Sequence, residues 1–106
     1  MLFYWFCNFY DVQALGVPRS GKWRPTRKNH LIKEPCCQIC ASKKKLEVHH
    51  IIPFSIDPSK ELLDENLVTL CIYCHFIFGH LGKWASYNEN LREDIEIWSK
   101  KIKERP

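Results

Sequence analysis

Two Cys-x-x-Cys pairs constrain the fold of this chain more than any other feature. Cys37 and Cys40 form the first pair, and Cys71 and Cys74 form the second. The second pair begins a predicted helix, where positions i and i+3 share a face. Four thiolates are common ligands of a closed, tetrahedral structural Zn²⁺ site. We therefore expect one zinc ion to hold the two pairs together.

The remaining cysteines leave alternatives open. Cys36 competes with Cys37, because Cys36-x-x-x-Cys40 could also chelate a metal, although the spacing favours Cys37. Cys7 is expected to be a buried or free thiol. Six cysteines would suit a disulfide framework in a secreted protein. The apolar N-terminus has no positive lead, however, and falls short of the roughly 20 residues that a membrane span needs. We therefore expect a cytoplasmic protein without a membrane association.

Size and charge restrict the class of protein. A chain of 106 residues fits one small domain, which often gains from a metal staple. The net charge of +4 is uneven. Residues 1–53 hold nine Lys or Arg against three acidic residues, and residues 54–106 hold seven against nine. Residues 19–30 carry five basic side chains and no acid, with Trp23 and His30 among them. A basic first half suits a polyanion such as nucleic acid, and we expect His30 to contact it or to be exposed.

The hydrophobic pattern predicts a hairpin followed by a helix. Residues 46–51 alternate in part and predict a strand, and residues 66–70 predict a second one. Residues 53–64 contain two prolines and predict a loop. Residues 71–78 predict a helix that Gly79 ends.

Two further helices are predicted on either side of this unit. Residues 27–33 form the first, with Pro25 near its start and Thr26 as its cap. The second starts near Asn88 or Asn90 and runs to about Lys103. Its helically spaced apolar residues form a buried stripe of Leu91, Ile95, Trp98 and Ile102.

The adjacent pair His49-His50 divides into two roles. Neighbouring residues on a strand point to opposite faces, so both cannot easily bind the same ion. A histidine that is free of metal can act as a general base on water. His75 lies about 100° around the helix from Cys74, so it faces away from the zinc site and toward the strand. We expect a divalent ion between His49 and His75.

His80 is the third histidine near this place. On a continuous α-helix it would lie about 140° from His75, since the two are five residues apart. If Gly79 ends the helix, His80 could turn back as a third ligand or a phosphate contact. A surface or capping histidine is the alternative.

Asn66 precedes the second strand and, taken alone, is an ordinary turn residue. Fifteen residues separate it from His50 and eight from His75. In this combination we expect Asn66 to bridge the loop and to hold the base in its tautomer.

Residues 37–84 resemble the HNH endonuclease family, whose fold is the ββα-metal or treble-clef finger. The resemblance rests on Leu-Glu-Val-His-His-Ile-Ile-Pro-Phe at residues 46–54, Asn-Leu-Val-Thr-Leu-Cys at 66–71 and Cys-His at 74–75. Residues 74–84 resemble a subgroup that is common in phage and bacterial genomes. The resemblance implies an α+β fold, a small zinc-stapled finger with flanking helices, in the cytoplasm of a bacterial or phage-infected cell.

The family implies a role for each matching position. His49 and His75 would bind the catalytic ion, His50 would be the general base, and Asn66 would orient it and stabilise the loop. Cys37, Cys40, Cys71 and Cys74 would hold structural zinc. Some members place a third metal histidine four residues after the second, but that position is Gly79 here and the histidine is His80.

The implied reaction is the metal-dependent hydrolysis of a DNA phosphodiester, with Mg²⁺, Mn²⁺, Ni²⁺ or Zn²⁺ as the catalytic ion. We expect an N-terminal extension (1–30), a nuclease core (31–84) and a C-terminal helix (85–106), with the extension or the last helix open to a protein partner. The DNA backbone contacts would come from the basic segment, namely Arg19, Lys22, Arg24, Arg27 and Lys28. The alternatives are a non-catalytic zinc-finger module that binds nucleic acid and a thiol redox protein.

Overall fold

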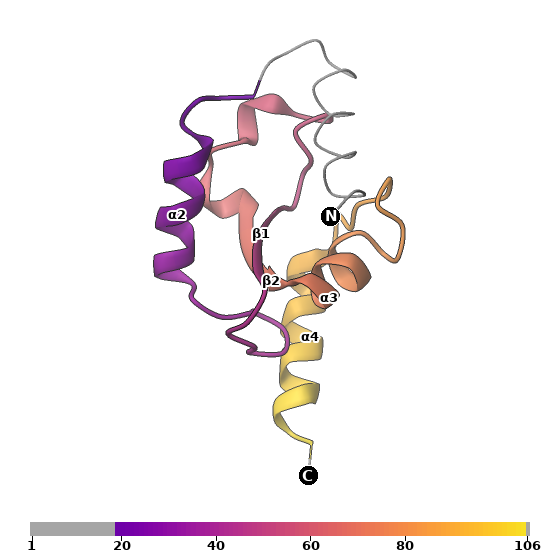
Figure 1. The fold of residues 1–106 in the computed structure, drawn as a ribbon. Coiled ribbons are helices and arrows are strands. Elements are labelled where there is room, and N and C mark those ends of the chain that lie inside the picture. Colours follow the sequence, from indigo (N-terminus) through magenta and orange to yellow (C-terminus); the bar gives the residue numbers. More distant parts are fainter. Residues whose placement is uncertain (1–18, 106) are drawn as a thin grey trace.

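The computed structural model describes residues 19–105, so the predictions for Cys7 and for the aromatic residues 1–18 lie outside the described range. The regular elements, in chain order, are α2 (Trp23–Lys33), β1 (Leu46–His50), β2 (Leu67–Cys71), α3 (Ile72–Cys74), a π-helical turn (His75–Gly79) and α4 (Leu91–Lys103). Figure 1 shows α2 on one side of the β1–β2 hairpin and α3 and α4 on the other. The α+β fold class predicted from the sequence is confirmed.

The hairpin is antiparallel and positions the histidine pair. Its register pairs Leu46 with Cys71 at one end and His50 with Leu67 at the other. Every residue of β2 is buried, because helices cover the hairpin on both sides. The connection between the strands contains two short 3₁₀ turns, Pro58–Lys60 and Asp64–Asn66, where the sequence predicted only a loop.

Helix α2 begins at Trp23, four residues before the predicted start at Arg27. Pro25 is compatible with this start, because the N–H groups of a first turn have no acceptor within the helix. The predicted cap at Thr26 is therefore wrong, since Thr26 lies inside the helix. The Ser20 carbonyl accepts from the Trp23 N–H at 3.2 Å instead.

The His30 side chain connects α2 to the segment that leads into β2. Its side chain is only 2% exposed, which corrects the expectation of an exposed or DNA-contacting residue. Nδ1 lies 3.0 Å from the Asp64 carboxylate and Nε2 lies 2.9 Å from Glu34 Oε1. Glu34 Oε1 also accepts from the Thr69 N–H on β2 at 3.1 Å. The domain boundary predicted at residue 30 falls inside α2.

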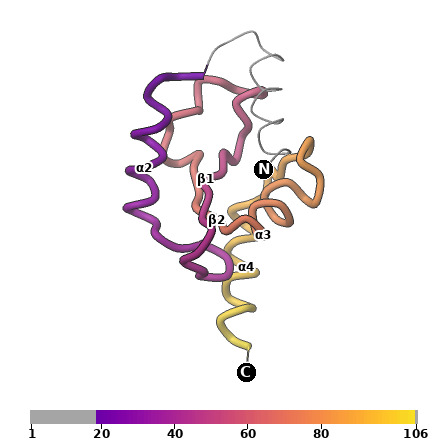
Figure 2. Tube along the Cα trace, in the orientation of Figure 1, coloured from indigo at the N-terminus to yellow at the C-terminus, as the bar shows by residue number. Residues whose placement is uncertain are grey.

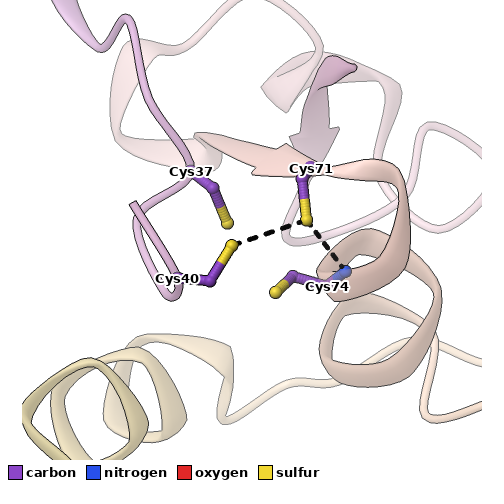
Figure 3. Close-up of side chains that lie close together, drawn as sticks. All are labelled: Cys37, Cys40, Cys71 and Cys74. Atoms are coloured by element: carbon purple, nitrogen blue, oxygen red, sulfur yellow. Dashed lines mark hydrogen bonds between the residues drawn. The ribbon is translucent and has the colours of Figure 1, made fainter. Parts of the chain in front are cut away.

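The four cysteines of the two pairs meet in one cluster (Figure 3). Their sulfur atoms all lie within 4.8 Å of one another. The Cys40 and Cys71 sulfurs are 3.7 Å apart, close to the edge of about 3.8 Å that a tetrahedron with 2.3 Å Zn–S bonds requires. Cys37 is the member of the cluster and Cys36 is not, as the spacing predicted. The residues present therefore fit a structural zinc ion.

Burial raises the pKa of the Cys74 thiol, and the neighbouring Cys37 raises it further. A metal ion that binds the cluster must therefore displace protons, which is the usual behaviour of a thiolate site. The two Cys-x-x-Cys pairs also face each other across one centre. This arrangement favours shared metal ligation over a separate redox pair.

Helix α4 begins and ends close to the predicted residues, with Asn90 as its N-cap residue. Of its predicted stripe, Leu91 is fully buried, whereas Trp98 is 38% exposed and packs beside Phe78 at a ring distance of 5.8 Å. Figure 2 shows why, because the last turns of α4 extend beyond the hairpin. Ile95 and Ile102 are half-buried and also pack against the core, so only Trp98 departs from the predicted stripe.

Within residues 19–105, no helix combines the length and the apolar character that a membrane crossing requires.

The cysteine cluster predicts a selective loss of zinc. Replacing Cys37 with serine should lower the zinc content by one ion per chain, measured by elemental analysis. The melting temperature should fall, since such a site supplies roughly 10–16 kcal/mol of apparent binding free energy. Cys36→Ser is the matched control and should keep the zinc. The opposite pattern would reverse the choice between Cys36 and Cys37.

The buried position of His30 predicts a stability effect. His30→Ala leaves two carboxylates without their shared partner and should lower the free energy of unfolding by about 1–3 kcal/mol. Urea denaturation would measure the change. Asn29→Ala, an exposed change in the same helix, should stay within about 0.5 kcal/mol. Equal effects of the two substitutions would contradict a stabilising role for the contacts of His30.

Candidate active site

The three histidines predicted as ligands come together from two elements. His49 lies on β1, His75 begins the π-helical turn and His80 directly follows that turn. One ligand nitrogen from each ring lies within 4.8 Å of the others. The ring centroids are 4.8 to 5.0 Å apart. We call these three side chains the histidine cluster.

The π-helical turn explains how His80 reaches this place. The His80 N–H donates to the His75 carbonyl at 3.1 Å, the i→i+5 bond that defines a π-helix. Residues five apart are therefore one turn apart here. The angular offset of about 140° expected for an α-helix does not apply. Single π-helical turns within helices are frequent at functional sites.

Gly79 makes room for the His49 ring. A Cβ atom built on Gly79 would lie 3.1 to 3.3 Å from three atoms of that ring. Contacts this short require a neighbour to shift by a few tenths of an ångström. Glycine at the end of the π-helical turn therefore allows the imidazole on β1 to lie directly against the helix backbone.

Hydrogen bonds at the outer nitrogens fix the tautomers of two rings. His80 Nδ1 lies 2.7 Å from the Ser86 carbonyl, which can only accept, so Nδ1 carries the proton. His75 Nδ1 donates likewise to Glu47 Oε1 at 2.8 Å. Both Nε2 lone pairs then face inward, and the two Nε2 atoms are 3.2 Å apart. Such lone pairs repel each other unless a proton or a cation lies between them.

His49 supplies the third inward nitrogen. Its ring is fully buried, and burial lowers its pKa well below 6.5, helped by the nearby His75 and His80. Among residues 19–105, its Nε2 finds no hydrogen-bond partner. Ideal metal–nitrogen bonds of 2.0–2.1 Å give a tetrahedral edge of about 3.4 Å, close to the spacing of the other two Nε2 atoms. The residues present therefore fit a divalent ion with an open coordination position.

Aromatic rings cover one side of the cluster. The Trp84 ring centroid lies 5.3 Å from that of His75 and 5.0 Å from that of His80. Phe76 packs on Trp84 at 5.0 Å. Apolar surroundings of this kind limit solvent access and lower the local dielectric around a metal.

His50 faces away from the cluster, as the alternation of a strand predicts. Its Nε2–H donates to the Glu61 carbonyl at 2.9 Å, which leaves a lone pair on Nδ1. Burial lowers the pKa of His50 to about 4, although the hydrogen bond to Glu61 opposes the shift. The ring is therefore neutral at pH 7. The Trp23 ring packs against it with centroids 4.5 Å apart.

Asn66 stabilises the loop, but it does not hold the His50 ring. Its Oδ1 accepts from the Ile52 N–H at 2.8 Å, and its Nδ2 donates to the carbonyls of Ile52 and Lys60 at 3.1 Å. The expectation that Asn66 holds the base in its tautomer is wrong in its direct form, because Glu61 contacts the ring. Asn66 instead ties together both ends of the segment that leads to Glu61.

Two groups that contact these histidines were not predicted from the sequence. Glu47 lies two residues before His49, on the same face of β1, so strand alternation could have found it. The Glu61 group that contacts His50 is a main-chain carbonyl, for which side-chain identity carries no signal.

The predicted phosphate contacts fall into two groups. Arg19 Nε donates to the buried Glu61 carboxylate at 2.7 Å, so this side chain is engaged within the protein. The other four lie on α2 or at its N-cap position. They are exposed or half-buried on this surface, namely Lys22, Arg24, Arg27 and Lys28.

Comparison with known proteins agrees with this geometry. Residues 37–77 match the family model described as HNH endonuclease. No curated protein and no solved structure matches the chain. The matched range contains all four clustered cysteines together with His49, His50, Asn66 and His75, and it ends before His80. The chain therefore carries a domain of the HNH endonuclease family at residues 37–77.

Proposed function

We propose that this protein is a metal-dependent DNA endonuclease in which His50 is the general base and the histidine cluster holds the catalytic ion. The observation that carries the proposal is the contrast between neighbours on β1. His49 presents an unpartnered, buried nitrogen to two other imidazoles, and His50 presents a neutral ring to the opposite side. An HNH domain implies binding to nucleic acid, and the basic surface of α2 supports DNA as the substrate.

The chain's own residues supply the proton transfer. His50 would take a proton from water at Nδ1, while Nε2–H stays bonded to the Glu61 carbonyl. An approaching phosphate anion would favour the imidazolium that forms, since opposite charges stabilise each other. Trp23 packs against this ring, with the two centroids 4.5 Å apart. A general base of this kind contributes about 10²–10⁴-fold to a rate.

A divalent ion in the histidine cluster would act as a Lewis acid that neutralises charge on the phosphorane and on the leaving 3′ oxygen. Three imidazole ligands favour Zn²⁺ or Ni²⁺ over Mg²⁺, which prefers oxygen ligands. Glu47 and the Ser86 carbonyl would keep the ligand rings of His75 and His80 oriented, as outer partners of metal-bound histidines commonly do.

DNA would approach along α2. The exposed basic residues on this helix would contact phosphates and place the backbone near Trp23 and His50. A module that only binds nucleic acid needs neither a cluster of three imidazoles nor a neutral histidine held on the opposite face of the same strand. That alternative remains as one outcome of the cleavage test.

The role of His50 predicts a loss of cleavage without a loss of metal. His50→Ala should reduce the rate of supercoiled-plasmid cleavage, with Zn²⁺, Ni²⁺, Mn²⁺ or Mg²⁺ added, by about 10²–10⁴-fold. Metal content and DNA affinity should remain at the level of the unmodified protein. Equal cleavage by both proteins, or no cleavage by either, would favour the non-catalytic binding module.

The contact at Gly79 predicts a selective effect on the histidine cluster. Gly79→Ala should displace the His49 ring and lower the affinity of this site for Zn²⁺ or Ni²⁺ by about tenfold or more. Titration against a competing chelator would measure it, and the four-cysteine site should keep its zinc. Gly21→Ala adds the same methyl group in open space and serves as the control. An unchanged affinity in Gly79→Ala would remove His49 from the ligand set.

A further inference from the structure

A buried ion pair connects the segment before α2 to the catalytic loop. Arg19 Nε donates to Glu61 Oε2 at 2.7 Å, and the Ser20 N–H donates to Glu61 Oε1 at 3.1 Å. The Glu61 side chain is 5% exposed and that of Arg19 is 20% exposed. Removing one partner of such a pair leaves an uncompensated buried charge, which is strongly unfavourable. The position of Glu61 therefore depends on Arg19.

Glu61 also holds the proposed base. Its carbonyl accepts the Nε2–H bond of His50 at 2.9 Å. One residue thus offers its carboxylate to Arg19 and its main-chain oxygen to His50. A displacement of the main chain at Glu61 would therefore affect both contacts together.

Aromatic contacts form a second connection between Arg19 and His50. The Arg19 guanidinium lies 4.7 Å from the centroid of the Phe54 ring and 5.9 Å from that of Trp23. Trp23 in turn packs against His50. Arg19 therefore acts on the base along two routes, through Glu61 and through Trp23, and its own pose is fixed by both.

We propose that Arg19 is a positioning residue for His50, acting chiefly through Glu61, and that a phosphate contact is not its main role. The expected effect on kcat rests on the proposed nuclease function. The arrangement of the imidazole can be measured without any cleavage.

The kinetic test separates positioning from DNA binding. In the full chain, Arg19→Ala should lower kcat by up to about 100-fold, the effect of a small misplacement of a catalytic group, while KM and its salt dependence stay the same. Arg24→Ala is the contrast. It should raise KM and reduce the slope of log affinity against log salt by about one. Arg105→Ala removes the same charge near the C-terminus and should change neither quantity.

Glu61→Gln keeps the carbonyl and the side-chain acceptor but loses the charge. If the route through the ion pair is right, the effects of Arg19→Ala and Glu61→Gln on kcat should not add in the double variant. Additive effects, or an effect of Arg19→Ala on KM alone, would overturn the proposal.

The ¹⁵N shifts of the His50 imidazole give a readout that is independent of cleavage. The unmodified protein should show a protonated Nε2 and an unprotonated Nδ1, and Arg19→Ala should show a mixture of tautomers. An unchanged His50 signal in this variant would overturn the proposal, even in a protein that cleaves nothing. Absent cleavage with the expected change in tautomer would overturn only the nuclease function.

Zinc content and the melting temperature would show whether each variant is folded. If Arg19→Ala loses its zinc, the Arg19→Lys variant is tested in its place. Lysine keeps the charge but lacks the Nε donor and the planar group over Phe54. The same change in tautomer is expected there. A His50 signal identical to that of the unmodified protein in both Arg19→Lys and Glu61→Gln would again overturn the inference.

Discussion

The sulfur cluster is the constraint on which the rest of the structure depends. It joins the turn at residues 37–40 to the last residue of β2 and the last residue of α3, and most of the small core surrounds it. Cys37, Cys71 and Cys74 belong to the same buried cluster as Val68 and Leu70. A domain of this size has little apolar surface to bury. The bonds to the zinc ion that this cluster fits would therefore set the geometry from which both the strand and the π-helical turn extend.

Two local rules then separate the proposed roles of the histidines. Strand alternation sends His49 to the ligand side and His50 to the other, so neighbouring residues meet different surroundings. On the ligand side, the buried Nε2 of His49 has no hydrogen-bond partner among the described residues and lies beside the imidazoles of His75 and His80, which suits a cation. On the other side, a main-chain acceptor and an indole ring hold one neutral imidazole. Burial keeps both rings uncharged, yet only one of them retains a lone pair that faces away from the metal site.

Much of this could be predicted from the sequence, and the failures have physical reasons. The alternation of residues predicts the hairpin, and the ligand chemistry of the two Cys-x-x-Cys pairs and of the histidines predicts that these distant segments meet. Helix α2 starts four residues before the predicted Arg27, because proline is tolerated in a first turn. The buried contacts of His30 and Arg19 are harder to predict, because Asp64 lies 34 residues from His30 and Glu61 lies 42 residues from Arg19. The contact between the Glu61 carbonyl and His50 involves no side-chain identity at all.

The π-helical turn has a consequence for how such sites can diversify. One additional residue in a helix changes which side chain meets the strand, while the hairpin and the sulfur cluster stay in place. The number of residues between two ligand histidines is therefore a poor criterion for deciding whether two related sites bind a metal in the same way. A chain with histidine at either the fourth or the fifth place can present the same triangle of nitrogens, provided that the helical pitch changes to match.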